Sequence, residues 1–242
     1  MSIIQPSAAF WASQAPAGGG PDPYGAYRVL AIRGNQTDGI TDLTGRHTPA
    51  LYGGASVTAF SGPFAAYTSV VRCIGSGGSR LAVPDSADFN VGSGDFTFQK
   101  WLFNDGTTGG QIVGQYNGVD ANGCVFLYCD ANAGGYYYAY TSSAGTGTAG
   151  SNWFVEQAWQ HVALERQGTA LRLYRGGVVK ATVSLSPGQV LTDSTLELAF
   201  GSRSGGAALD LACYLCDIIV YKGVAIYGGS SYTPPTGPMS VV

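Results

Sequence analysis

Short runs of apolar or alternating residues, separated by clusters of turn-forming residues, occupy the chain from Tyr24 onward. In Phe96–Phe103, alternate residues point to opposite faces, and Phe96, Phe98 and Lys100 share one of them. No stretch of about twelve residues shows the helical period. This pattern predicts an all-β chain of roughly a dozen strands, which means a sandwich or a barrel.

Turn signals mark where the predicted strands begin and end. Gln167-Gly168-Thr169 predicts a hairpin between two of them, and Gly176-Gly177 predicts the next turn. The Gly-rich segment 134–150 is predicted to be a mobile loop around one short strand. The expected strands are Tyr27–Ile32, Ser69–Ile74, Phe96–Phe103, Gln111–Tyr116, Cys124–Cys129, Tyr136–Tyr140, His161–Arg166, Ala170–Tyr174, Val178–Leu185, Leu196–Phe200 and Leu215–Tyr221.

Residues 1–23 differ in composition from the rest and are predicted to form an N-terminal arm with a Pro/Gly linker. Residues 24–242 are long enough to form one β-sandwich domain. An aromatic pair on such an arm predicts a docking element for a neighbouring subunit, and a disordered tail is the alternative. The apolar residues expected to dock are Ile3, Ile4, Phe10 and Trp11.

Charged residues make up only 11% of the chain, whereas hydrophobic residues make up 45%, enough for a core between two sheets. Low charge indicates a surface covered by other protein or one solvated by small polar residues. The net charge of −3 and the absence of a Lys/Arg run argue against nucleic-acid binding. No apolar run is long enough to span a membrane. Residues 1–6 lack the features of a signal peptide, so we expect release by lysis or assembly.

The chain has five cysteines, so at least one stays a thiol or pairs with another chain. Cys213 and Cys216 have the spacing of half a zinc or redox site, and a metal site could add Cys73 and Cys124. Buried thiols in strands, or disulfides formed in an oxidising medium, would equally account for these residues. We favour buried thiols and predict neither metal nor cofactor. The residues concerned are Cys73, Cys124, Cys129, Cys213 and Cys216.

The ionisable residues do not form a recognisable catalytic set. Glycosidases on β-sandwiches use two neighbouring carboxylates, but Glu156, Glu165 and Glu197 are isolated from one another in sequence. His161 falls inside an apolar strand, where a buried and hydrogen-bonded imidazole is expected. No glycine-rich phosphate loop opens a helix. The sequence therefore predicts a protein without enzymatic activity.

Two loops carry further polar residues. His47 lies between an arginine and a threonine-proline pair and is predicted to be solvated. Asp85 and Asp88 lie three apart in one turn and are predicted to cap it through their carboxylates.

A tyrosine-rich segment is the candidate for sugar binding. A pyranose has an apolar face and a ring of hydroxyls, so its sites combine aromatic surfaces with hydrogen-bonding groups. Asp105, Asn117, Asp120 and Asn122 in neighbouring loops are further candidates. The alternative is a strand whose two faces are both packed. The predicted glycan contacts are Asp130, Asn132, Tyr136, Tyr138 and Tyr140.

Four segments resemble, in the same order, those of the laminin-G-like, concanavalin A-like jelly rolls in virion proteins of tailed bacteriophages. They match the patterns V-P-x-S-x-D-F, G-D-F-T-I-E-x-W, W-x-H-V-A-x-x-R with L-x-L-Y, and a closing strand followed by two prolines. The resemblance covers about residues 24–238. The segments are Ser69–Gly75 with Arg80–Phe89, Gly94–Trp101, Trp159–Arg166 with Leu171–Tyr174, and Lys222–Tyr227 with Pro234-Pro235.

This resemblance implies an antiparallel β-sandwich jelly roll with an extended N-terminal arm. It implies a non-enzymatic virion protein, made in the host cytoplasm, that serves as a capsid decoration, cement or head-fibre protein. Such a protein docks on capsid or tail subunits through its arm and low-charge surface, as a homo-oligomer. The alternative is a carbohydrate-binding adhesin of a phage tail or fibre that holds host surface glycans.

Three positions depart from the family pattern. Gln99 stands where a glutamate is usual, and Ile219 stands where an arginine is usual. Packing, or Cys216, is therefore expected to replace an ion-paired sheet face. Arg175 stands where the aspartate of an Asp-Gly turn is usual, which weakens the case for calcium, because calcium needs clustered oxygen ligands.

Overall fold

A computed structural model describes residues 22–106, 109–116, 125–130, 134–141, 144–150, 155–206 and 208–240, and in 125–150 it describes the backbone and the Leu127 side chain. No helix of these residues is long and apolar enough to cross a membrane. The strands are β1 (Arg28–Ile32), β2 (Ala50–Tyr52), β3 (Ser56–Ala59), β4 (Ser69–Ile74), β5 (Arg80–Val83), β6 (Phe96–Asn104), β7 (Gly110–Gly114), β8 (Val125–Asp130), β9 (Gly134–Thr141), β10 (Ala144–Gly150), β11 (Trp159–Gln167), β12 (Ala170–Arg175), β13 (Val178–Ser184), β14 (Leu198–Phe200) and β15 (Ala212–Lys222).

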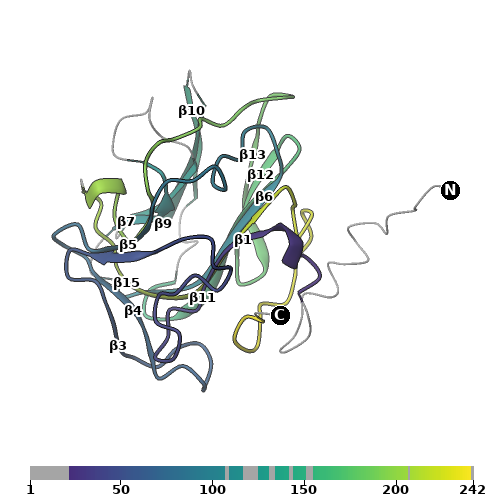
Figure 1. Ribbon diagram of the computed structural model, residues 1–242. Helices are drawn as coiled ribbons and strands as arrows, with labels where there is room; N and C mark the ends of the chain where they lie inside the picture. The colour runs from purple at the N-terminus through teal and green to yellow at the C-terminus, as the bar shows by residue number, and fades with distance from the viewer. Residues whose placement is uncertain are drawn as a thin grey trace.

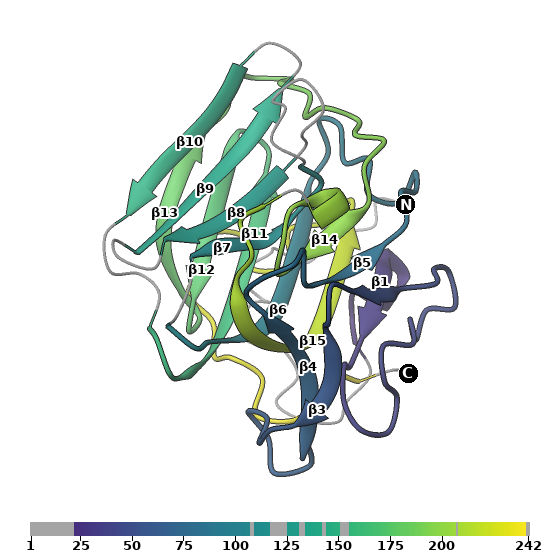
Figure 2. The same cartoon turned by 90° about the vertical axis from the view of Figure 1, so that its left-hand side faces the viewer.

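Two antiparallel sheets form the described part of the molecule (Figure 1). The first is eight-stranded, with order β13-β12-β11-β6-β15-β4-β3 and β1 paired to β15. The second has the order β10-β9-β8-β7-β14-β5-β2. Figure 2 shows β8, β9 and β10 of the second sheet lying over β11, β12 and β13 of the first. The predicted antiparallel β-sandwich is confirmed.

The interior between the sheets is apolar, and the central strand β6 shows how the alternation builds it. Phe96, Phe98 and Leu102 belong to the main core cluster, as the period-2 pattern predicts. Lys100 shares this inner face and is only 3% exposed. Its ammonium donates to the carbonyl of Ile112, which supplies part of the compensation that a buried charge requires.

The Gly-rich segment 134–150 differs from its prediction. Instead of one short strand within a loop, residues 134–141 and 144–150 form the strands β9 and β10, which pair antiparallel, with β10 at one edge of the second sheet. Its Gly and Thr residues carry no strong apolar signal, but pairing with β9 gives hydrogen-bond partners to the backbone groups on one side of β10. The short strands β2, β3 and β5 were also absent from the predicted strands. Strands β2, β3, β5 and β10 are defined by backbone hydrogen bonds to neighbouring strands, which a local sequence pattern does not show.

Candidate functional site

The outer face of the eight-stranded sheet, which points away from the main core, carries aromatic and polar side chains. Trp101 of β6 lies directly opposite His161 of β11 and Cys216 of β15. Two residues earlier on β6, Gln99 lies opposite Ile219 of β15. The positions arise from strand alternation, because residues two apart share a face. Three neighbouring strands thus place rings and hydrogen-bonding groups side by side.

The C-terminal segment, residues 223–240, covers part of this face (Figure 1, yellow). The backbone amide of Tyr227 donates to the carboxylate of Glu165 at 2.7 Å, and that of Met239 donates to Asp217 at 2.9 Å. These bonds hold the segment against β11 and β15. Where the segment crosses the turn between β12 and β13, Gly177 has a φ of 79°, and a Cβ there would overlap the backbone of the segment. Only glycine fits this crossing.

A cavity of about 80 Å³ lies between the sheet face and this segment. On that measure a water needs at least 10–15 Å³, so the cavity holds roughly five waters or one small ring. The cavity combines aromatic surface with hydrogen-bonding groups. Residues that line it include Gln99, Trp101, His161, Asp217, Tyr227 and Tyr232.

His161 and Trp101 form one wall of the cavity. The ring centroids lie 5.3 Å apart in an edge-to-face arrangement, and Nδ1 of His161 lies 2.7 Å from the hydroxyl of Tyr232. Burial lowers the pKa of His161 to about 3, so the imidazole is neutral near pH 7. The buried, hydrogen-bonded state predicted for His161 is therefore observed. Nε1 of Trp101 is buried without a partner in the described structure.

Asp217 also lines the cavity and holds an unusual backbone conformation. Its φ is 48°, in the left-handed region, beside the irregularity of β15 between Cys216 and Ile219. Its carboxylate accepts from the Tyr67 hydroxyl at 2.5 Å and from the amide of Met239. Burial raises its pKa to about 6, although these hydrogen bonds act in the opposite direction. Asp217 is therefore an acceptor whose charge changes near neutral pH.

Glu165 is a second buried carboxylate of the outer face and is fully buried. Besides the amide of Tyr227, it accepts from the hydroxyl of Tyr174 at 3.0 Å. The guanidinium of Arg172 lies 3.9 Å away. Burial raises the pKa of Glu165 against the effect of these donors. This carboxylate anchors the C-terminal segment.

Two of the three altered family positions are direct neighbours on this face. Gln99 and Ile219 lie opposite each other in the pairing of β6 with β15. Gln99 accepts from the Tyr227 hydroxyl, and Ile219 packs with Met239. Packing therefore occupies the place of the expected ion pair. Cys216 does not, because it lies opposite Trp101 instead.

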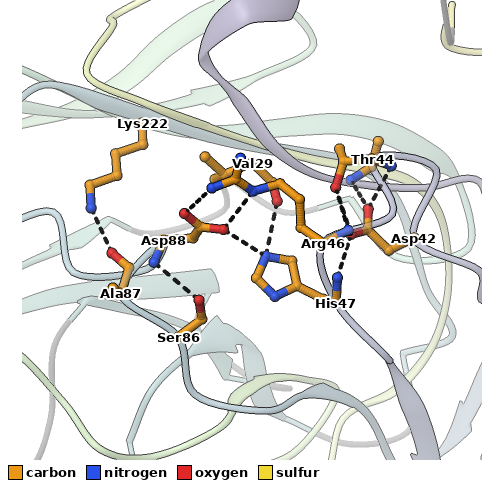
Figure 3. Close-up of polar contacts among 10 residues, drawn as sticks. Val29, Asp42, Thr44, Arg46, His47, Ser86, Ala87, Asp88 and Lys222 are labelled. Atoms are coloured by element: carbon orange, nitrogen blue, oxygen red, sulfur yellow. Dashed lines mark hydrogen bonds and ion pairs between the residues drawn. The ribbon is translucent and has the colours of Figure 1, made fainter.

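Two loops near the first strand form a separate polar network, which Figure 3 shows. The Asp42 carboxylate accepts from the amides of Ala31, Thr44, Arg46 and His47 and from the Thr44 hydroxyl, so it organises its own loop. In the described residues no group of three His, Cys, Asp or Glu side chains comes together to hold a metal.

The same network corrects two predictions. His47 is not solvated: its side chain is 6% exposed, stacks on Phe89 and directs Nε2 to Val29 O at 3.0 Å. Asp88 does not cap its turn through its carboxylate. The guanidinium of Arg46 binds that carboxylate at two atoms and holds its pKa below the usual value (Figure 3). Asp88 pairs with Arg46 of the other loop instead of capping its own turn, because the two N–H groups of a guanidinium match the two oxygens of a carboxylate.

Most residues predicted for binding lie outside the described structure. Ile3, Ile4, Phe10, Trp11, Cys124 and Asn132 are not described, and neither are the side chains of Cys129, Asp130, Tyr136, Tyr138 and Tyr140. Their roles stay predictions. The described cysteines, Cys73, Cys213 and Cys216, are buried thiols. The sequence did not predict the cavity, because part of its lining, including Tyr227 and Tyr232, belongs to the C-terminal segment. The alternation in Phe96–Phe103 indicated that Gln99 and Trp101 share a face, and His161 was expected to be buried in its own strand.

Residues 75–225 match the family of the concanavalin A-like lectin/glucanases superfamily. The match spans more than half of the chain, and the protein belongs to this superfamily. It includes the strands β6, β11 and β15 that bear the site, whereas β1 and the Pro234-Pro235 pair lie outside it. No curated protein matches the sequence.

Solved structures of clostridial toxins share the fold. The binding domain of Paraclostridial Mosquitocidal Protein 1 is 16% identical, with a TM-score of 0.63, over 84% of this chain and 51% of that one. Botulinum neurotoxin type C, whose cell entry depends on two ganglioside molecules, is 12% identical, with a TM-score of 0.62, over 83% and 49%. The serotype D ligand binding domain, in complex with N-acetylneuraminic acid, is 11% identical, with a TM-score of 0.62, over 85% and 50%. This chain spans about half the length of these structures.

Proposed function

We propose that this protein binds carbohydrate and that a neutral sugar residue enters the cavity of the outer face. The observation that carries the proposal is the pairing of ring surface with hydrogen-bonding groups in one small cavity. Trp101 and Tyr232 line it with rings, and Asp217 lines it with a carboxylate. A sugar ring needs both kinds of surface. The unpartnered Nε1 of Trp101 gives a sugar hydroxyl a donor to accept from.

The charges of the cavity favour a neutral sugar over an acidic one. Arg28, a cationic residue of the lining, lies 3.5 Å from the carboxylate of Asp22 and donates to the carbonyl of Ser240. Asp217 adds negative charge above its pKa, and His161 is neutral. An anionic sugar would therefore be repelled by the Asp217 carboxylate, while Arg28, the cationic side chain among the described lining residues, already pairs with Asp22. The gangliosides and N-acetylneuraminic acid bound by the toxins support carbohydrate as the class of ligand, but they do not support an acidic sugar for this cavity.

Binding without hydrolysis fits the carboxylates of this face. A glycosidase needs one carboxyl group as acid and another as base or nucleophile, both facing the substrate. Glu165 and Asp217 instead accept backbone amides of the C-terminal segment. Reducing-end assays on the oligosaccharide that binds should show no cleavage above buffer. Cleavage that Glu165→Gln removes would contradict this part of the proposal.

A virion attachment role remains the second candidate, on the strength of the closing segment Lys222–Tyr227 and the Pro234-Pro235 pair. Capsid decoration, a head fibre, and a tail or fibre adhesin are all compatible with a glycan-binding sandwich. Deletion of residues 1–23 tests the docking arm. Loss of the protein from assembled particles is expected, and full occupancy would contradict docking through the arm.

Glycan arrays followed by calorimetry test the proposal with a matched pair of variants. Trp101→Phe keeps a ring but removes Nε1, and it should weaken binding about 5- to 10-fold, the value of one hydrogen bond. Trp159→Phe is the control, because Nε1 of Trp159 donates to Ser61 O, and Trp159 does not line the cavity. No binding to any bacterial surface polysaccharide would overturn the function. Loss of binding in Tyr138→Ala alone would move the site to the tyrosine-rich segment.

A further inference from the structure

Cys73 and Cys213 lie directly opposite each other on adjacent antiparallel strands. Cys73 is on β4 and Cys213 is on β15, both on the inner face in the main core cluster, and each is 1% exposed. Opposed residues in antiparallel strands have Cα atoms about 4.5 or 5.5 Å apart. Disulfides join Cα atoms about 4.4–6.8 Å apart. The strand pairing therefore brings these two thiols within bridging range without moving the backbone.

The same geometry separates Cys213 from Cys216, although the two are close in sequence. An interval of three residues on a strand places the side chains on opposite faces. Cys213 belongs to the main core, whereas Cys216 packs with Phe64, Tyr67 and Val70 in a separate cluster on the outer face of the sheet. The spacing that suggests a redox or zinc half-site therefore does not act as one.

We propose that Cys73 and Cys213 are a disulfide site that closes when the protein meets an oxidising medium containing a small-molecule disulfide. The Cys73 thiolate attacks one sulfur of that disulfide and releases its first thiolate. The Cys213 thiolate then attacks the sulfur of Cys73 and releases the second. One protein disulfide forms, the small disulfide is reduced to two thiols, and two protons pass to them.

The surroundings of Cys73 suit it to the first step. A hydrogen bond from Cys213 lowers the pKa of the Cys73 thiol against the effect of burial, and the charge of Lys100 acts in the same direction. Gly201 has a φ of 94°, and a Cβ there would come within 2.5 Å of Cys73 Sγ. The backbone is thus packed closely around the thiol. Burial makes the exchange slow in the folded protein, because the small disulfide must reach a thiol that is only 1% exposed.

The bridge would fasten β4 to β15, the strand that carries Asp217 and Ile219. It would close a loop on the order of 140 residues, which is among the longer loops that a disulfide can restrict in the unfolded chain. The melting temperature should therefore rise by roughly 10 °C on oxidation.

The test refolds the reduced full chain in a glutathione redox buffer and maps its peptides by mass spectrometry without reduction. The expected result is a peptide that joins Cys73 to Cys213. Both cysteines recovered as alkylated thiols, or Cys213 joined to Cys124 or Cys129, would overturn the proposal.

Two variants give a second readout. Cys213→Ala should abolish the difference in melting temperature between oxidised and reduced protein. Cys216→Ala, which removes a buried thiol from the other face, should retain it. A redox-dependent shift that survives in Cys213→Ala would also count against the pair.

Discussion

The two faces of the eight-stranded sheet are both buried over β6, yet they are buried in different ways. The inner face packs Phe96, Phe98 and Leu102 against the second sheet. The outer face places Gln99 and Trp101 against loops and the C-terminal segment. The inner face gains stability from the removal of apolar area from water, an effect that does not depend on the orientation of the groups. The outer face depends on hydrogen bonds that must be aligned, because a buried polar group without a partner is costly.

This difference explains where a binding site can exist. A close-packed apolar layer leaves little room and few donors. Rings and polar groups held under a covering segment leave a small cavity and the unpartnered Trp101 donor. Substitutions on each face can test the contrast between them.

The largest effect is expected on the inner face. Phe96 is fully buried, and its ring centroid lies 5.1 Å from that of Phe98. Phe96→Ala should lower the free energy of unfolding by about 3–5 kcal/mol, because it removes apolar contacts and leaves a cavity. Urea denaturation followed by fluorescence measures it. A loss below about 1 kcal/mol would mean that the inner face is not the main source of stability.

The next effect is expected where the outer face holds the C-terminal segment. Glu165→Ala leaves the Tyr227 amide and the Tyr174 hydroxyl without their acceptor, and should cost about 2–3 kcal/mol. Glu156→Ala is the matched control, since Glu156 is exposed and should change stability by about 0.5 kcal/mol or less. Equal effects would show that the segment is not anchored by Glu165.

Asp217 gives the outer face a pH dependence that the inner face lacks. Its pKa is about 6 in the folded protein against 3.8 ordinarily, so the folded state binds the proton more tightly. Its contribution to stability is fully present below pH 4 and is lost as the pH rises through 6, by roughly 3 kcal/mol. His161 opposes this, because its lowered pKa makes stability fall as the pH falls below 6.5.

The difference in unfolding free energy between wild type and Asp217→Asn separates the two contributions. Wild type should lose about 2–3 kcal/mol of unfolding free energy relative to Asp217→Asn between pH 4 and pH 7, because only wild type ionises at this position. Chemical denaturation at several pH values measures it. A difference that stays constant across this range would refute the raised pKa.

The smallest effect is expected at the exposed ion pair. Arg46 binds Asp88 at two atoms, but its side chain is 50% exposed, so water and salt screen the charges. Arg46→Ala should cost about 1 kcal/mol or less, and less in high salt. A loss as large as that of Glu165→Ala would erase the distinction between buried and exposed carboxylates.

The sequence predicted the strands best where one face is apolar. The alternation in β6 identified its inner face, including Lys100, and most expected strands are present. It failed at β10, where Gly and Thr alternate without apolar residues, because pairing with β9 decides that strand. It failed at His47 and Asp88 because their partners come from other segments, Val29 of β1 for His47 and the loop residue Arg46 for Asp88.

The candidate site was predictable only in part. The sequence placed Trp101 and His161 on strands, and the alternation of Phe96–Phe103 put Trp101 on the face opposite Phe96 and Phe98. It did not show that residues 223–240 return across that face or that Tyr232 reaches His161. That contact joins positions 71 residues apart. A local pattern carries no information at such a distance.

By itself, the sequence determined the all-β sandwich, the inner face of its central strand and the membership of a superfamily. These follow from local periodicity and short motifs, since alternation and turn chemistry act over a few residues. Only the tertiary structure decided which carboxylates are buried, where the C-terminal segment lies, and that Cys73 faces Cys213 but not Cys216. Sheet pairing and burial set these features, and both depend on residues distant in the chain.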